Sequence, residues 1–156
     1  MKICLYIVGK TKNSGIEKEI NEFKRRIEHY VKFEINTIIE PRERKNYSLE
    51  QIKKSESELI LAKIEKSDFV VLLDERGKEY TSNEFASFIQ LKMNSGIKKV
   101  VFIIGGAYGF GEDVYKRANE LVALSKLTFS HQIVRLIFIE QLYRAFTIIK
   151  GEPYHH

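Results

Sequence analysis

The sequence predicts a single α/β domain over residues 1–156, with a parallel sheet that is flanked by helices. Short apolar runs alternate along the chain with segments of helical periodicity, which is the pattern of βαβ units. The strongest run, residues 100–104, is made of β-branched and aromatic residues, as in a strand covered on both faces. It ends at Gly105 and Gly106, and ligands of open α/β sheets bind beyond the carboxyl ends of such strands.

Four strands are expected where apolar runs stop at glycine, proline or acidic residues. Their ranges are residues 2–8, 33–39, 69–73 and 99–104. Residues 124–129 form a shorter segment, which we interpret either as a brief fifth strand or as a loop. Because each strand is followed by a helical segment, neighbouring strands are expected to run parallel.

Five helices are expected after these strands. Their ranges are about 14–30, 48–64, 81–96, 112–122 and 131–150. The first begins at Asn13 or Ser14, residue types that accept hydrogen bonds from the first turn of a helix. Capping boxes open the second and third helices, and they pair Ser48 with Gln51 and Thr81 with Glu84. Glu112 and Asp113 favour the start of the fourth helix, and Gly151 ends the fifth.

The last helix is apolar on nearly all sides, with twelve apolar residues spread around its axis. They are Ile133, Val134, Leu136, Ile137, Phe138, Ile139, Leu142, Tyr143, Ala145, Phe146, Ile148 and Ile149. A helix of this kind is buried all round. One face should therefore pack on the sheet and the other on a second copy of the chain, so a homodimer is expected.

The composition indicates a cytoplasmic protein that has no membrane segment. Lys and Arg number 26 and Asp and Glu number 21, so the net charge is +5, which mildly favours a polyanionic partner. The sequence contains no apolar stretch near the ~20 residues that span a bilayer, and its start lacks the pattern of a signal peptide. Cys4 is the single cysteine, so an internal disulfide is excluded, and we expect it to be a small buried apolar residue.

The segment 41–47 is the most basic loop of the chain, with Arg42, Arg44 and Lys45. It is either an ordinary solvated loop or a loop that faces RNA. The sequence leaves both interpretations open.

Several familiar chemistries lack their motifs here. A phosphate-binding P-loop is absent, and the sequence around Gly109 and Gly111 lacks the third glycine of a dinucleotide fingerprint. The four histidines do not show metal-ligand spacing, so no metal is expected. Ser125 and Ser130 lie near His131, but the strained turn of a serine nucleophile is absent.

What remains is a pocket of backbone groups at the ends of the third and fourth strands, completed by residues 124–129. Polar residues follow it in the sequence, among them His131 and Arg135 at the start of the last helix. Glu140 and Arg144 lie on roughly the opposite side of that helix. They form either a simple i,i+4 ion pair or a pair in which Glu140 orients Arg144 toward a phosphate or a base.

Five motifs, taken in order, resemble a single family. They are Leu72-Leu73-Asp74-Glu75-Arg76-Gly77-Lys78 with Ser82, Glu84, Phe85 and Ala86; Phe102-Ile103-Ile104-Gly105-Gly106-Ala107-Tyr108-Gly109; Leu124-Ser125-Lys126-Leu127-Thr128-Phe129-Ser130-His131-Gln132 with Arg135; Glu140-Gln141-Leu142-Tyr143-Arg144-Ala145; and Gly151-Glu152-Pro153-Tyr154-His155. Over its whole length the chain is similar to the RlmH family of SPOUT RNA methyltransferases. These small enzymes methylate N3 of a pseudouridine in large-subunit ribosomal RNA.

The resemblance implies a deep C-terminal trefoil knot, a rare exception to unknotted topology. It also implies S-adenosylmethionine bound in the knot, a homodimer packed through the knotted helices, and ribosomal RNA within the ribosome as substrate. Carried over position by position, the cofactor contacts are Leu73, Gly105, Leu124, Ser125, Lys126, Leu127, Thr128 and Phe129. Two residues depart from the family pattern. Tyr108 replaces a small or acidic residue at the pocket mouth, and Ser130 replaces a proline that would stiffen the entry to the last helix.

The implied reaction transfers a methyl group to a ring nitrogen that must first lose its proton. His155, His131 and Tyr154 are candidate proton acceptors, and Arg144 and Arg135 are candidate stabilisers of the developing anion. Residues 152–156 are expected to turn back over the pocket and to add little to stability. Two other classes stay open from the residues alone: an RNA-binding module without activity, and a transferase that acts on a small molecule.

Overall fold

The structure is a computed structural model that describes residues 1–40 and 46–156. Its elements, in chain order, are β1 (Lys2–Val8), α1 (Ser14–Glu28), β2 (Lys32–Ile38), α2 (Leu49–Leu61), β3 (Phe69–Glu79), α3 (Ser82–Asn94), β4 (Lys99–Ile104), α4 (Glu112–Arg117), β5 (Glu120–Ala123) and α5 (Ile133–Lys150). The strands form one sheet in the order β2-β1-β4-β3-β5. All four neighbouring pairs are parallel, as the alternation of strands and helices predicted.

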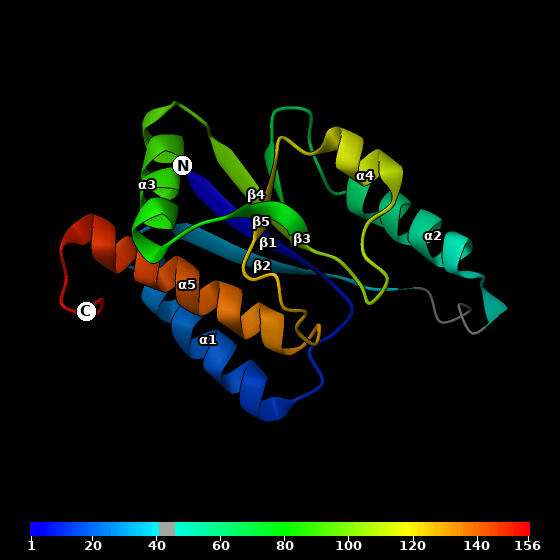
Figure 1. Cartoon of the computed structure of the whole chain (residues 1–156), viewed down its shortest axis with the longest axis horizontal. Coiled ribbons are helices and arrows are strands. Elements are labelled where there is room, and N and C mark those ends of the chain that lie inside the picture. Colours follow the sequence, from blue (N-terminus) through cyan, green and yellow to red (C-terminus); the bar gives the residue numbers. More distant parts are fainter. Residues whose placement is uncertain (41–45) are drawn as a thin grey trace.

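The helices cover the two faces of the sheet as separate layers (Figure 1). α1, α3 and α5 pack on one face, with α5 between the other two, and α2 and α4 pack on the opposite face. β4 is the central strand, and the side chains of β4 and its neighbour β1 are almost all buried because both faces are covered. This arrangement leaves the carboxyl ends of β3 and β4 open toward the segment that leads into α5.

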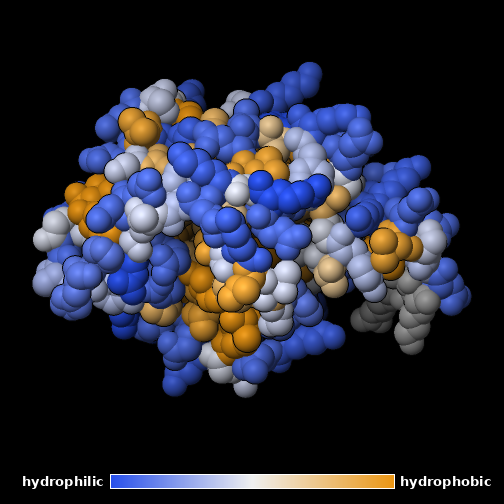
Figure 2. Space-filling view, viewed as in Figure 1, coloured by the Kyte–Doolittle hydropathy of each residue, from blue (hydrophilic) through white to orange (hydrophobic). Residues whose placement is uncertain are grey.

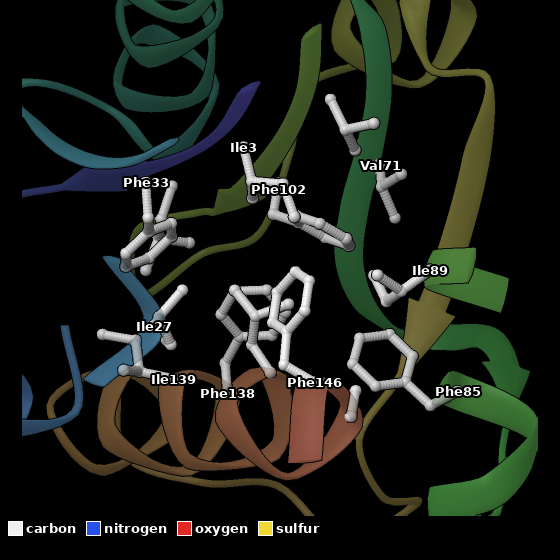
Figure 3. Packing of buried hydrophobic residues seen from close by; sticks show 14 of the residues in the cluster. Ile3, Ile27, Phe33, Val71, Phe85, Ile89, Phe102, Phe138, Ile139 and Phe146 are labelled. Atoms are coloured by element: carbon white, nitrogen blue, oxygen red, sulfur yellow. The ribbon is translucent and has the colours of Figure 1, made fainter. Parts of the chain in front are cut away.

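Aromatic side chains fill the larger core, between the sheet and α5 (Figure 3). Phe138 and Phe146 of α5 are fully buried, and the ring of Phe138 lies 4.8 Å from that of Phe102 on β4. Burial of one such side chain stabilises the fold by about 1.5–3 kcal/mol. α5 is therefore anchored to the sheet along most of its length.

The helix starts form as their local sequences predict. Asn13 accepts hydrogen bonds from the backbone N–H groups of Gly15 and Ile16, and it begins α1. Both predicted capping boxes are present, at Ser48 and at Thr81. A cap depends on residues three apart, so it can be predicted without knowledge of the tertiary structure.

The predicted end of the fourth helix was wrong, and residues 124–129 form a loop, which is the second of their two interpretations. α4 ends at Arg117, not near residue 122, and the fifth strand is Glu120–Ala123, not residues 124–129. Asn119 explains the difference, because its backbone N–H donates to the Val70 carbonyl while its side-chain oxygen accepts from the Val70 N–H. These hydrogen bonds dock the chain beside β3, and such pairing overrides local helix propensity.

β3 is longer than predicted, since it continues beyond Leu73 to Glu79. Its pairing with β5 shifts register between Leu73 and Lys78, so β3 bulges around the end of β5. Gly77 permits the close approach. A Cβ at this position would lie 2.5–2.7 Å from backbone atoms of Leu121 and Val122.

Further findings concern the cysteine, possible membrane or metal-binding segments, and the basic loop. Cys4 is buried, as expected. In the described part of the chain, no helix is long and apolar enough to cross a membrane, and no three His, Cys, Asp or Glu side chains gather as they would around a metal ion. Arg42, Arg44 and Lys45 of the predicted basic loop lie outside the described residues.

Candidate active site

A cavity of about 740 Å³ opens at the carboxyl ends of β3 and β4, and we call it the strand-end cavity. Its walls come from the end of β3, the glycine loop after β4, part of α4, the segment 124–131 and the first turn of α5. The predicted cofactor contacts that line it are Leu73, Gly105, Leu124, Ser125, Leu127, Thr128 and Phe129. Lys126 does not line it, and its ammonium lies 3.7 Å from the Glu79 carboxylate. Residues far apart in the sequence thus gather at the predicted edge of the sheet.

Two glycines of the loop after β4, Gly105 and Gly106, are packed closely against other residues. A Cβ on Gly105 would lie 3.1–3.4 Å from the Phe110 ring. A Cβ on Gly106 would lie 2.6–2.9 Å from the carboxylate of Glu56, a buried residue of α2. Packing against α2 and Phe110 therefore favours glycine at these two positions.

The segment between β5 and α5 is held by short-range hydrogen bonds. The Ser125 hydroxyl accepts from the Leu127 N–H at 2.9 Å, and the Ser130 hydroxyl accepts from the Ile133 N–H at 3.3 Å. Gln132 ties this segment to the β1–α1 loop, because its side-chain oxygen accepts from the Lys12 N–H. Ser130, which stands in place of the family's proline, therefore supports the entry to α5 through its hydroxyl. His131 lies in this segment and lines the strand-end cavity.

Arg135 does not reach the strand-end cavity. Its side chain is fully buried, and its guanidinium donates to the Val8 carbonyl at 2.8 Å and to the Thr11 hydroxyl at 2.9 Å. Burial lowers the pKa of Arg135, and the nearby charge of Glu40 opposes this shift. The contacts assign Arg135 to the β1–α1 loop, and the sequence did not indicate this because the helical spacing places it beside His131.

Arg144 and Tyr154 lie together at the other end of α5. Arg144 forms the predicted ion pair with Glu140 at 2.6 Å, and the Tyr154 hydroxyl donates to the same Glu140 oxygen at 3.0 Å. The Arg144 guanidinium lies 4.8 Å from the centre of the Tyr154 ring. Glu140 therefore joins the two candidates in one network. Burial and the Glu140 carboxylate raise the pKa of Tyr154.

The C-terminal tail, residues 152–156, does not turn back over the cavity of its own chain, so this prediction was wrong. Tyr154 packs edge-on against Tyr143 with 4.8 Å between ring centres. Glu152 accepts a hydrogen bond of 2.5 Å from the Tyr30 hydroxyl. These contacts hold the tail against the last turns of α5. Among the described residues, His155 has a buried Nδ1 without a hydrogen-bond partner.

The structure thus sorts the predicted site residues into two groups. His131 and the cofactor contacts lie before α5, and Arg144, Tyr154 and His155 lie near its end. α5 has 18 residues, so it separates its ends by roughly 27 Å. A single chain does not bring the two groups together.

Three polar residues of the cavity wall that were not predicted as site residues form a cluster: Asp74, Arg76 and Tyr115. The Tyr115 hydroxyl donates to Asp74 at 2.5 Å, and Asp74 also accepts from the Arg76 backbone at 2.9 Å and side chain at 3.2 Å. A signal existed in the sequence, because Asp74 follows a buried strand directly. Tyr115 carried no signal, since its place depends on how α4 packs.

A parallel α/β sheet with a cavity beside a glycine loop at its carboxyl edge is typical of proteins that bind nucleotides and related cofactors. The match to the family described as "Predicted SPOUT methyltransferase" covers residues 1–155, and the chain belongs to this SPOUT methyltransferase family. The predicted fold class and the resemblance are thereby confirmed.

Individual relatives indicate which members of the family the chain resembles. The chain is 53% identical to "Ribosomal RNA large subunit methyltransferase H" of Christiangramia forsetii, over 100% of this chain and 99% of the relative. Proteins of the same name are 51% identical in Parabacteroides distasonis, over 100% and 99%, and in Cytophaga hutchinsonii, over 100% of both chains. These matches support the enzymatic interpretation over the RNA-binding module.

Proposed function

We propose that this chain is an S-adenosylmethionine-dependent methyltransferase that methylates N3 of a pseudouridine in large-subunit ribosomal RNA on the ribosome, in the cytoplasm. The strand-end cavity carries the proposal, because it joins the predicted cofactor contacts in a member of a methyltransferase family. Its volume of about 740 Å³ suits a small-molecule cofactor. The names of the relatives support the RNA substrate.

The cofactor fits a site that offers main-chain groups beside its side chains. Leu73, Gly105 and the segment 124–129 offer backbone N–H and C=O groups that suit a flat base and its ribose. S-adenosylmethionine, when bound, supplies a methyl group activated by a sulfonium. The chain has to orient the reactants and exclude water. We also infer the family's C-terminal trefoil knot, which the close crossing of β3 and β5 at Gly77 supports.

The target nitrogen carries a proton that the enzyme must remove or share. The raised pKa of Tyr154 favours a neutral phenol that donates to Glu140, so Tyr154 suits the role of a positioning or stacking group. We assign the proton acceptor to His155, with His131 as the second candidate. Arg144, held by Glu140, is placed to stabilise negative charge on the base.

The two separated groups support a homodimer in which the tail of one chain meets the cavity of its partner. Apolar side chains gather on the surface over the N-terminal half of α5 (Figure 2). Leu127, Phe129 and Ile133, next to the cavity, are 75%, 38% and 47% exposed in the single chain. Burying such a patch against a second copy stabilises the pair, and two-fold symmetry would supply two equivalent sites.

Methyl transfer to ribosomal particles tests the proposal. Purified protein with radiolabelled S-adenosylmethionine should label particles from a strain that lacks the modification, and mapping should place the label on N3 of a pseudouridine. Short naked stem-loops should be poor substrates, because a net charge of +5 provides phosphate contacts but few elements that read bases. Label on a small molecule, or no label on particles, would contradict the proposal.

A further inference from the structure

The strand-end cavity has a polar wall that the proposed adenosine contacts leave unexplained. Asp74 and Arg76 come from the continuation of β3, and Tyr115 comes from α4. Side chains alternate along a strand, so Leu73 points to the α5 face of the sheet while Asp74 points to the α4 face. The cavity therefore crosses the edge of the sheet and has a different chemistry on each side.

The three side chains hold one another in place. Tyr115 donates to one Asp74 oxygen at 2.5 Å, and the other oxygen accepts from the Arg76 backbone N–H and from its Nε. Arg76 also donates to the Tyr115 hydroxyl, and its guanidinium lies 4.4 Å from the centre of the Tyr115 ring. The Asp74 side chain is 9% exposed and that of Arg76 is 66% exposed. A fixed carboxylate and an accessible guanidinium thus stand side by side.

Both groups carry their charge at neutral pH. Burial raises the pKa of the Asp74 carboxyl, but the hydrogen bonds from Tyr115 and Arg76 outweigh it and leave the pKa below its ordinary value. Burial, reinforced by Asp74, raises the pKa of Tyr115, so its hydroxyl remains a donor. The cluster therefore presents one negative and one positive charge. Lys53 and Glu75, which also line the cavity, add one charge of each sign, so the net charge stays zero.

We propose that Asp74 and Arg76, positioned by Tyr115, bind the amino-acid end of the cofactor. Asp74 accepts from the α-ammonium group, and Arg76 donates to the α-carboxylate. This inference rests on the proposed function, because it extends the same cavity. Asp74 is one residue beyond Leu73, about 3.3 Å along the strand, so a ligand with its adenosine at Leu73 has this wall within reach of its tail.

The charge pattern favours a zwitterion over an RNA phosphate. A phosphate would gain from Arg76 but would meet the Asp74 carboxylate beside it. An α-amino acid offers one charge of each sign at the spacing of adjacent groups, and both pairs are charge-assisted hydrogen bonds. Because Tyr115 holds the partners before binding, little side-chain freedom is lost.

Binding of two ligands tests the assignment without any need for turnover. S-adenosylhomocysteine has the complete amino-acid end, and 5′-methylthioadenosine lacks it. Calorimetry should show that Arg76→Gln and Asp74→Asn each weaken S-adenosylhomocysteine by about tenfold or more, while 5′-methylthioadenosine changes less than about twofold. Tyr115→Phe should weaken S-adenosylhomocysteine by a smaller factor, because it loosens the partners and removes neither of them.

Decarboxylated S-adenosylhomocysteine separates the two contacts. Its affinity should be nearly the same for wild type and Arg76→Gln, since the group that Arg76 binds is missing, and it should still fall in Asp74→Asn. Lys116→Gln is the matched control, because Lys116 is an exposed cation on α4 that pairs with Glu112 outside the cavity. It should bind all three ligands as wild type does.

Unchanged S-adenosylhomocysteine affinity in Arg76→Gln and Asp74→Asn, with unaltered melting temperatures, would overturn the inference. So would an equal loss for both ligands, which would mean that the cluster only shapes the cavity. A wild-type protein that binds 5′-methylthioadenosine as tightly as S-adenosylhomocysteine would also contradict it, while leaving the proposed function in place. A wild-type protein that binds neither ligand would overturn the proposed function as well.

Discussion

The two ends of α5 are built in different ways. Before the helix, the strand-end cavity is built from strand ends and loops, with three glycines after β4 and exposed apolar side chains at its mouth. After the helix, the tail is held by side chains, through the Glu140 network and a cluster of aromatic rings. Loops and glycines suit the binding of a cofactor that is the same in every reaction cycle. Polar and aromatic side chains suit the recognition of one particular nucleotide. Under the proposed function, these two ends are the half-sites that one chain contributes to a shared dimer.

Aromatic packing makes the tail end more ordered than its terminal position suggests. Tyr30 stacks on Phe146 at 5.6 Å, and Tyr143 lies between the Tyr30 and Tyr154 rings. Each such pair contributes about 0.5–1.5 kcal/mol. Only the Tyr143–Tyr154 pair involves the tail, so we expect a small loss of stability when the tail is removed.

The largest effect is expected from a change at the cavity end. Gly105→Val should abolish detectable S-adenosylhomocysteine binding, a loss of about a hundredfold or more, because the side chain meets the Phe110 ring and the cavity. Calorimetry measures the binding, and circular dichroism reports the fold. Gly96→Ala is the control, since it lies outside the cavity and nothing is within 4 Å of its Cβ, although its φ of +77° adds some strain. Undiminished binding in Gly105→Val would place the cofactor elsewhere.

Removal of the tail should affect the other half-site alone. A chain ending at Gly151 should transfer methyl groups at least about tenfold more slowly, yet bind S-adenosylhomocysteine as wild type does. Its melting temperature should fall by a few degrees, because the Tyr143–Tyr154 contact is lost. If the truncated chain kept full activity, the tail would have no part in the reaction, and the proton acceptor would be His131.

Mixing the two damaged chains distinguishes a shared site from a site within one chain. In a mixed dimer, the truncated chain supplies an intact cavity and the Gly105→Val chain supplies an intact tail. Random exchange should then restore about a quarter of wild-type activity, since half of the dimers are mixed and each has one complete site. Labelled transfer after co-refolding measures it. Two chains that stay inactive together, but form dimers in sedimentation, would argue for a site within one chain.

The smallest effect is expected at the contact between Tyr30 and Glu152. Tyr30→Phe keeps the stacking on Phe146 and removes the hydrogen bond, so methyl transfer should fall about two- to fivefold, in kcat and not in the affinity for S-adenosylhomocysteine. Phe23→Leu, a change in the same aromatic cluster without a contact to Glu152, is the comparison variant.

The pH dependence of this contact has a definite sign. Burial and Glu152 raise the pKa of Tyr30, so the folded state holds the proton more tightly than the unfolded state. The contribution to stability is therefore present below about pH 10 and falls as the pH rises above it. Thermal melts of wild type and Tyr30→Phe should differ equally at pH 7 and pH 9. A difference that shrinks between these values would contradict this account.

Local patterns predicted most of the fold. The capping residues Asn13, Ser48 and Thr81 act within three residues, and the burial of β1 and β4 follows from apolar runs alone. The errors fell where distant segments compete with local preference. Asn119 ends α4 early because it pairs with Val70, 49 residues away in the sequence.

The sequence by itself determined the fold class, the family and the edge of the sheet where the cavity forms. These follow from the order in which strands, helices and motifs occur along the chain. Only the tertiary structure decided which side chains share that cavity. It assigned Arg135 to the β1–α1 loop, brought Tyr115 to Asp74, and held Tyr154 against Tyr143 at the far end of α5. Each of these contacts joins elements whose relative placement depends on packing across the sheet, and a linear pattern does not record the direction in which a long side chain points.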